Sequence, residues 1–129
     1  MINIKDGSVV IDDCYTLNSQ LSFNEFANST YYKRQNQEMM FSLDGLHKIG
    51  DRFFYVSLYF KENLLKRIHL SVEDDSIKGW EDEPNRKIIH DRLLRIIGIS
   101  ESADFVWGAV SSSYDPKGAS SHIIILYNN

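Results

Sequence analysis

The sequence of 129 residues has little of several things that would narrow its function. It contains one cysteine, Cys14, which cannot form an internal disulfide, so a reducing compartment is the simpler expectation. No apolar run approaches the ~18 residues that a membrane-spanning helix needs. The N-terminal stretch MINIKDG has no apolar signal-peptide core. These absences predict a cytoplasmic protein that does not enter a membrane.

Motifs for catalysis and for cofactor binding are also missing. The sequence has no GxGxxG fingerprint, no P-loop and no G-x-S-x-G elbow. Cys14 has no cationic neighbour in sequence to activate it as a nucleophile. The histidines lack the i, i+4 spacing or the cysteine pairs of a metal site; they are His47, His69, His90 and His122. We therefore expect no metal, no cofactor and no enzymatic activity.

The composition is that of one ordinary globular domain. Apolar residues make up 43% of the chain and charged residues 25%, which argues against disordered and fibrous classes. The net charge of −4 argues against nonspecific nucleic-acid binding, because such binding needs an excess of lysine and arginine. We expect no nucleic-acid partner.

The clearest structural pattern is a β-hairpin over residues 52–72. Apolar and polar residues alternate along its first arm, with Phe54, Val56, Leu58 and Phe60 on one face. Residues 61–63 form a short polar turn, and the second arm returns through Leu64, Ile68, Leu70 and Val72. The pattern predicts two antiparallel strands with one face in a core.

A helix is predicted from about residue 83 to residue 97. Asp82 is its expected cap, Pro84 suits its first turn and Gly98 ends it. An apolar stripe recurs at helical spacing, at Ile89, Leu93, Ile96 and Ile97. We expect this stripe to pack on the strand face that carries Phe54, Val56 and Leu58.

The remaining elements are shorter. We expect an opening hairpin from 2–4 and 9–11, a short helix capped by Ser22 with Glu25, a loop over 31–37, and strands over 39–43, 105–110 and 121–127. Asp115 to Gly118 forms the turn between the last two strands. Together the elements predict one α+β domain over residues 1–129. It has a mostly antiparallel sheet of about seven strands, one main helix on one face, and a short N-terminal helix.

Charge and aromatic residues predict a surface for a protein partner. Residues 73–83, the acidic connector, hold six acids and one lysine, a local charge of −5, so the rest of the chain carries +1. Such a cluster suits docking to a basic surface, although a solvated loop and a favourable helix N-terminus explain most of it. Tyr55 and Tyr59, to which Trp107 is added, form either a packing face or an exposed binding face. The candidate partner-binding residues are Glu73, Asp74, Asp75, Trp80, Glu81, Asp82, Tyr55, Tyr59, Tyr114 and Asp115.

Three segments carry a resemblance to a known group of proteins. They are RFFYVSLYFKENLLKRIHL, NRKIIHDRLLRIIG and FVWGAVSSSYDPKGASSHIIILY, within residues 52–127. In architecture they resemble small bacterial proteins, some of which are immunity proteins of polymorphic or contact-dependent toxin systems. The resemblance implies a non-enzymatic protein that binds and neutralises one cognate toxin, often a basic nuclease. It carries no catalytic motif.

Two alternatives remain open from the sequence. One is another small intracellular regulator, such as a phage-encoded inhibitor or adaptor, that uses the same surfaces. The other is a small enzyme whose site is assembled from His69, His122, Asp115 and Tyr114. Knowing the neighbouring reading frame would separate the toxin inhibitor from both alternatives most cheaply.

Overall fold

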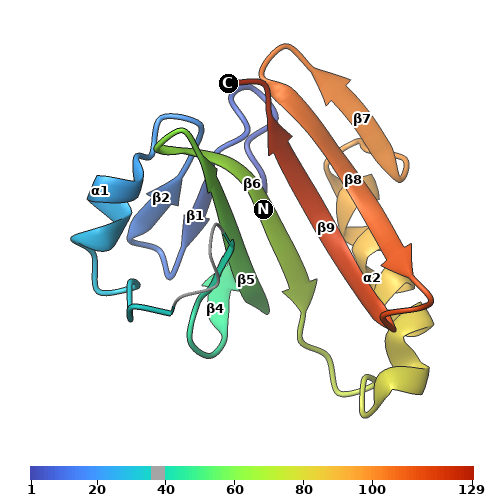
Figure 1. Ribbon diagram of the computed structural model, residues 1–129. Coiled ribbons are helices and arrows are strands. Elements are labelled where there is room, and N and C mark those ends of the chain that lie inside the picture. The colour runs from blue at the N-terminus through green and yellow to red at the C-terminus, as the bar shows by residue number, and fades with distance from the viewer. Residues whose placement is uncertain (36–39) are drawn as a thin grey trace.

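The computed structural model describes residues 1–35 and 40–129, and it confirms the α+β class. Figure 1 shows one strongly twisted sheet with helix α2 behind it and the N-terminal elements to one side. In chain order the elements are β1 (Val9–Ile11), β2 (Tyr15–Leu17), α1 (Phe23–Ala27), β3 (Met40–Ser42), β4 (His47–Ile49), β5 (Arg52–Lys61), β6 (Leu64–Val72), the 3₁₀ turn η1 (Trp80–Asp82), α2 (Glu83–Ile96), β7 (Ser102–Phe105), β8 (Gly108–Asp115) and β9 (Ser120–Tyr127).

The main sheet has seven antiparallel strands. Its order is β3-β5-β6-β9-β8-β7, and β4 also pairs with β5 beside β3. The last strand is central, because β9 lies between β6 and β8. Apolar residues on both faces of β9, Ile123 to Leu126, fit this central position.

The predicted hairpin β5–β6 is confirmed, with one local difference. Glu62 and Asn63 form the turn with φ values of 53° and 70°, the left-handed conformation of a tight primed hairpin turn. The register shifts between Tyr59 and Phe60. As a result Leu65 is the residue that turns into the core, whereas Leu64 is half-buried.

One face of the sheet is covered by two separate layers. On this face, alternate residues of β5, β6, β8 and β9 point into the hydrophobic core. They are fully or nearly fully buried, among them Phe54, Leu70, Val110 and Ile125. Helix α2 packs over β6, β8 and β9, while Val9, Ile11, Leu17 and Phe26 bring the β1–β2 hairpin and α1 into the same core. The opposite face of β6, β9 and β8 is turned toward the viewer in Figure 1, with no helix in front of it.

The opening hairpin was predicted with the wrong partner. Residues 2–4 do not form a strand; Ile2 makes a single bridge to Val9. β1 instead pairs with β2, through a turn in which Asp12 and Asp13 both have positive φ. The sequence did not reveal β2 because a strand of three residues is too short to show a pattern of alternating apolar and polar residues.

Asp12 joins this turn to two other parts of the chain. Its Oδ2 accepts hydrogen bonds from the Tyr31 hydroxyl at 2.9 Å and from His47 Nδ1 at 2.8 Å. Its Oδ1 accepts the backbone N–H of Lys48 at 2.9 Å. Burial raises the pKa of Asp12, but the hydrogen bonds from His47, Lys48 and Tyr31 outweigh burial and lower it. The Asp12 carboxylate therefore ties β1, β4 and the segment after α1 together.

The short helix and the third strand are close to their predictions. Ser22 caps α1 by accepting the backbone N–H of Glu25 at 3.1 Å, and the helix ends at Ala27. β3 covers residues 40–42, within the predicted 39–43; Met39, like the end of the predicted 31–37 loop, lies outside the described residues. Residues 46–51 form β4 and its turn into β5.

The strand predicted over 105–110 is wrong. Val106 and Trp107 are the turn of a hairpin between β7 and β8, and β8 continues through the serines to Asp115. Gly108 makes the turn possible: its φ is 157°, and a Cβ there would meet the Leu126 carbonyl oxygen. The predicted loop 111–120 is therefore strand up to residue 115 and a tight tip from 116 to 119.

Helix α2 is confirmed, but the face that it buries is not the predicted one. Its buried residues are Glu83, His90, Asp91 and Leu94. Ile89, Leu93 and Ile97 are only half-buried at the edge of the core, and Ile96 is 80% exposed. The expected packing of the stripe on Phe54, Val56 and Leu58 is found only in part: Leu93, Ile96 and Ile97 line a cavity together with Phe54, but α2 lies chiefly over β6, β8 and β9.

The buried polar residues of α2 explain why the helix turns this face, and not the apolar stripe, toward the sheet. His90 Nε2 accepts the backbone N–H of Val72 at 3.0 Å. The Asp91 carboxylate lies 2.8 Å from Lys87 Nζ. Buried polar groups are tolerated when they are paired, so partners on the sheet and on the helix itself replace apolar contacts on this face.

Candidate functional site

The acidic connector is partly a structural element. Asp74 Oδ1 accepts a hydrogen bond from Arg52 Nη2 at 2.8 Å, and its Oδ2 accepts from the hydroxyl and the backbone N–H of Ser76. The hydrogen bonds from Ser76, with a smaller contribution from Arg52, lower the pKa of Asp74. Asp74 therefore anchors the connector to β5.

Asp82 does not cap α2 with its side chain. The helix is preceded by η1, so Asp82 already has helical dihedral angles, and its Oδ2 accepts the backbone N–H of Lys78 at 2.9 Å. The predicted side-chain cap is wrong because the chain begins to coil one turn earlier. Like Asp74, Asp82 holds the connector in shape.

Glu83 fastens the connector to the β8–β9 hairpin. Its Oε1 accepts the backbone N–H of Ser121 at 3.1 Å, and the Ser121 hydroxyl donates to the Glu83 carbonyl at 2.9 Å. Arg86 Nη1 lies 2.9 Å from Glu83 Oε2 and neutralises the buried carboxylate. Since Ser121 pairs with Tyr114, this contact brings the hairpin tip beside the start of α2, as Figure 1 shows.

The structure therefore gathers several predicted partner-binding residues at one end of the sheet. Trp80 is 75% exposed, and Asp75, Glu81 and Asp115 are also exposed there. Tyr114 is 37% exposed, and Glu73 is half-buried. We call Asp75, Trp80, Glu81, Tyr114 and Asp115 the acidic end. Neither Asp75 nor Glu81 forms an ion pair with a residue that the structure describes.

The two tyrosines lie on the open face of the sheet. Tyr55 is 48% exposed and pairs with Ser71 near the start of the connector. Tyr59 lies further along β5, where the Arg67 guanidinium stacks over its ring at 4.7 Å. The structure thus places Tyr55 near the start of the acidic connector and Tyr59 further from it along β5.

Trp107 does not join these tyrosines. Its indole N–H donates to the Ile4 carbonyl at 2.9 Å, and its ring stacks on Phe105. The ring also lies so close to Gly7 that a Cβ there would overlap it. Trp107 therefore covers the N-terminal segment, and its assignment to the Tyr55 face is wrong.

Two of the four residues of the enzyme alternative come together. The rings of His69 and His122 lie side by side on the open face, with centroids 5.0 Å apart. Burial lowers the pKa of both, that of His69 to about 4. Asp115 accepts the backbone N–H of Lys117 inside the hairpin tip instead. Among residues 1–35 and 40–129, no group of three His, Cys, Asp or Glu side chains is placed to hold a metal.

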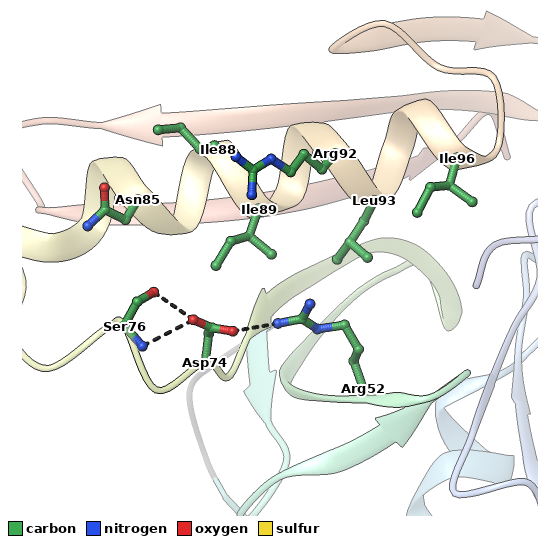
Figure 2. A pocket seen from close by; sticks show the side chains of 9 residues that line it. All are labelled: Arg52, Asp74, Ser76, Asn85, Ile88, Ile89, Arg92, Leu93 and Ile96. Carbon is green, nitrogen blue, oxygen red and sulfur yellow. Dashed lines mark hydrogen bonds and ion pairs between the residues drawn. The ribbon is translucent and has the colours of Figure 1, made fainter.

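A groove lies along α2, where sequence reasoning indicated a buried stripe. It has a volume of about 490 Å³ and runs between α2 and the chain that carries Arg52, Asp74 and Ser76 (Figure 2). From the helix it is lined by Asn85, Ile88, Ile89, Arg92, Leu93 and Ile96. The spacing of Ile88, Arg92 and Ile96 by four residues was the available signal for it.

Comparison with known proteins gives no relative. No family model, no curated protein and no solved structure matches the chain. Within the described ranges, no helix has the length and apolar character to cross a bilayer. The function must therefore be inferred from the geometry of the chain itself.

Proposed function

We propose that this chain is a non-enzymatic protein-binding module that docks a basic protein surface at its acidic end. The observation that carries the proposal is the 75% exposure of Trp80, next to the exposed Glu81 and on the same connector as the exposed Asp75. A tryptophan so exposed contributes little to folding. Tryptophan is also among the residues most enriched at the energetic centres of protein interfaces.

The surrounding carboxylates suit the same role. Asp74, Asp82 and Glu83 are used to hold the connector and the β8–β9 tip, whereas Asp75 and Glu81 remain free of ion pairs with described residues. Free carboxylates around an apolar anchor speed encounter with a basic partner and favour the correct orientation. The connector is thus held by hydrogen bonds while Asp75 and Glu81 stay available to a partner, which supports recognition of a basic protein surface.

The finer proposal is an immunity function. The architectural resemblance of residues 52–127 to small immunity proteins supports it, as does the acidic end, because a basic nuclease domain presents the complementary charge. In this proposal the chain binds one cognate toxin domain and blocks its active site. The partner would then be encoded by the neighbouring reading frame.

The test uses that neighbouring reading frame. Its C-terminal domain is expressed in a bacterial host with and without this chain, and growth is measured; the binding constant of the purified pair is measured in parallel. Trp80→Ala should weaken binding by about 30-fold or more, as for an interface hot spot. The control is Val106→Ala in the β7–β8 turn, a residue that is 99% exposed and distant from the acidic end along the sheet.

The outcomes separate the two levels of the proposal. Rescue of growth that is lost with Trp80→Ala and kept with Val106→Ala supports both. Binding without rescue supports a binding module and contradicts the immunity function. Equal binding by the two variants contradicts the acidic end as the docking site.

A further inference from the structure

The groove along α2 has two arginines on opposite walls. Arg92 extends from the helix, and Arg52 lies on the facing wall, where its guanidinium is turned toward Asp74 (Figure 2). Arg92 forms no hydrogen bond or ion pair with any residue in the described ranges. An arginine carries five N–H donors in a planar fork, so this one is available to an anion.

Arg52 is held in place by Asp74, and part of its guanidinium stays available for a further hydrogen bond. Its Nη2 donates to Asp74 Oδ1 at 2.8 Å, and Asp74 is in turn fixed by two hydrogen bonds from Ser76. The remaining donors of the guanidinium are not used by this contact. Asp74 compensates one positive charge, so the three charged groups of the groove sum to +1.

Between the arginines the groove is apolar. Ile89 and Leu93 form its floor at the edge of the core, and Ile88 and Ile96 form its rim. Ile88 and Ile96 are exposed, which leaves an aliphatic surface in contact with water. From Asn85 to Ile96 this surface extends roughly 16 Å along the helix axis.

We infer that the groove is a binding site for a small monocarboxylate with an aliphatic body. The carboxylate is received by Arg92 and Arg52, and the aliphatic body covers Ile89 and Leu93. The volume of about 490 Å³ lies within the range of small-molecule sites, and a few polar groups beside an apolar floor are typical of them. The inference concerns a surface other than the acidic end and does not depend on the proposed function.

The test is a titration of the ¹⁵N-labelled full chain with octanoate, followed by amide chemical shifts. Octanoate should shift the amides of residues 85–96, of Arg52 and of residues 74–76 in a saturable way. Acetate, which lacks the body, and octanol, which lacks the charge, should each bind at least about ten-fold more weakly, since the arginine pair and the apolar floor both contribute.

Two variants and one control locate the contacts. Arg92→Gln removes the free guanidinium and should weaken octanoate binding about ten-fold, while Ile96→Ser should weaken it several-fold. Arg95→Gln, an exposed arginine of the same helix that does not line the groove, should bind as the unaltered chain does. All three changes are at the surface, so an unchanged amide spectrum without ligand shows that the fold is kept.

Several results would overturn the inference. One is the absence of saturable shifts up to about 10 mM octanoate, well beyond the Kd of a small ligand. Another is a set of shifts centred elsewhere than the groove. Equal binding of octanol and octanoate, or equal losses with Arg92→Gln and Arg95→Gln, would remove the arginines from the site.

Discussion

His90 of α2 accepts the backbone N–H of Val72 through Nε2 at a distance of 3.0 Å, in an interface where His90 has no exposed surface. This bond requires a neutral ring with its proton on Nδ1. Burial, together with a smaller effect of the nearby Arg86, lowers the pKa of His90 to about 3. The junction of helix and sheet therefore depends on an uncharged histidine.

The stability of the chain should consequently fall with acidity below the ordinary histidine pKa. Above pH ~6.5 His90 is neutral in both folded and unfolded chains, so it causes no pH dependence. Between about 6.5 and 3 only the unfolded chain takes up this proton, which costs about 1.4 kcal/mol of stability for each pH unit. His69 and His122 act in the same direction. Urea unfolding at pH 7, 6 and 5 measures the slope.

His90→Gln provides the control for this pH dependence. The glutamine carboxamide oxygen can accept the Val72 N–H without titrating. The variant should lose part of its stability at pH 7, and its free energy of unfolding should fall less steeply toward pH 5. An identical slope in both proteins would show that His90 is not the responsible group.

Adjacent leucines of α2 should differ in their contribution to stability. Leu94 has no exposed surface, so Leu94→Ala should cost about 2–5 kcal/mol of the free energy of unfolding. Leu93 is half-buried beside the groove, and Leu93→Ala should cost only about 1–2 kcal/mol. Chemical denaturation of both variants checks this. A larger loss at Leu93 would restore the helix face expected from the sequence.

The contact between α2 and the β8–β9 hairpin should be sensitive to one hydroxyl. Ser121→Ala removes the donor to the Glu83 carbonyl and the buried Ser121 side-chain oxygen, at a cost of about 1–3 kcal/mol. Ser113→Ala, on the open face of β8, should cost less than about 0.5 kcal/mol. Thermal unfolding of the pair measures the difference, and equal losses would contradict a stabilising role for this contact.

Neighbouring aspartates in the β1–β2 turn offer another matched pair. Asp12 accepts three hydrogen bonds from distant residues, whereas Asp13 forms an exposed ion pair with Lys48. Both residues have positive φ, so alanine brings similar backbone strain at each. Asp12→Ala should therefore cost about 2–4 kcal/mol, and Asp13→Ala less than about 1 kcal/mol. Similar values from urea denaturation would contradict the structural role of Asp12.

The sequence predicted those elements whose side-chain pattern was determined by burial alone. β5 alternates along its length, and α2 has a proline at its start and a glycine after its end, so the β5–β6 hairpin and α2 were identified with bounds close to the observed ones. The β6–β9–β8 arrangement was not predictable, because strand order depends on contacts between residues far apart in the chain.

The orientation of α2 was missed for a physical reason. Periodicity assigns apolar residues to the core, but Glu83, His90 and Asp91 are buried here, where Ser121 and Lys87 pair with the two carboxylates and Val72 donates to His90 Nε2. None of these partnerships can be inferred from spacing. The groove with Arg52 and Arg92 follows from the same orientation of the helix, which exposes Ile96, a residue that the pattern placed inside.

The central position of β9 has a consequence for the order in which the chain folds during synthesis. β6 and β8 both pair with β9, yet both leave the ribosome before it. Until residues 120–127 emerge, two strand edges wait without a partner, and unpaired edges invite association between nascent chains. The pairing of β6 and β8 with β9 can form only after all the other helices and strands described here have been synthesised. Release of a chain lacking β9 should therefore yield a species captured by chaperones rather than a smaller native domain.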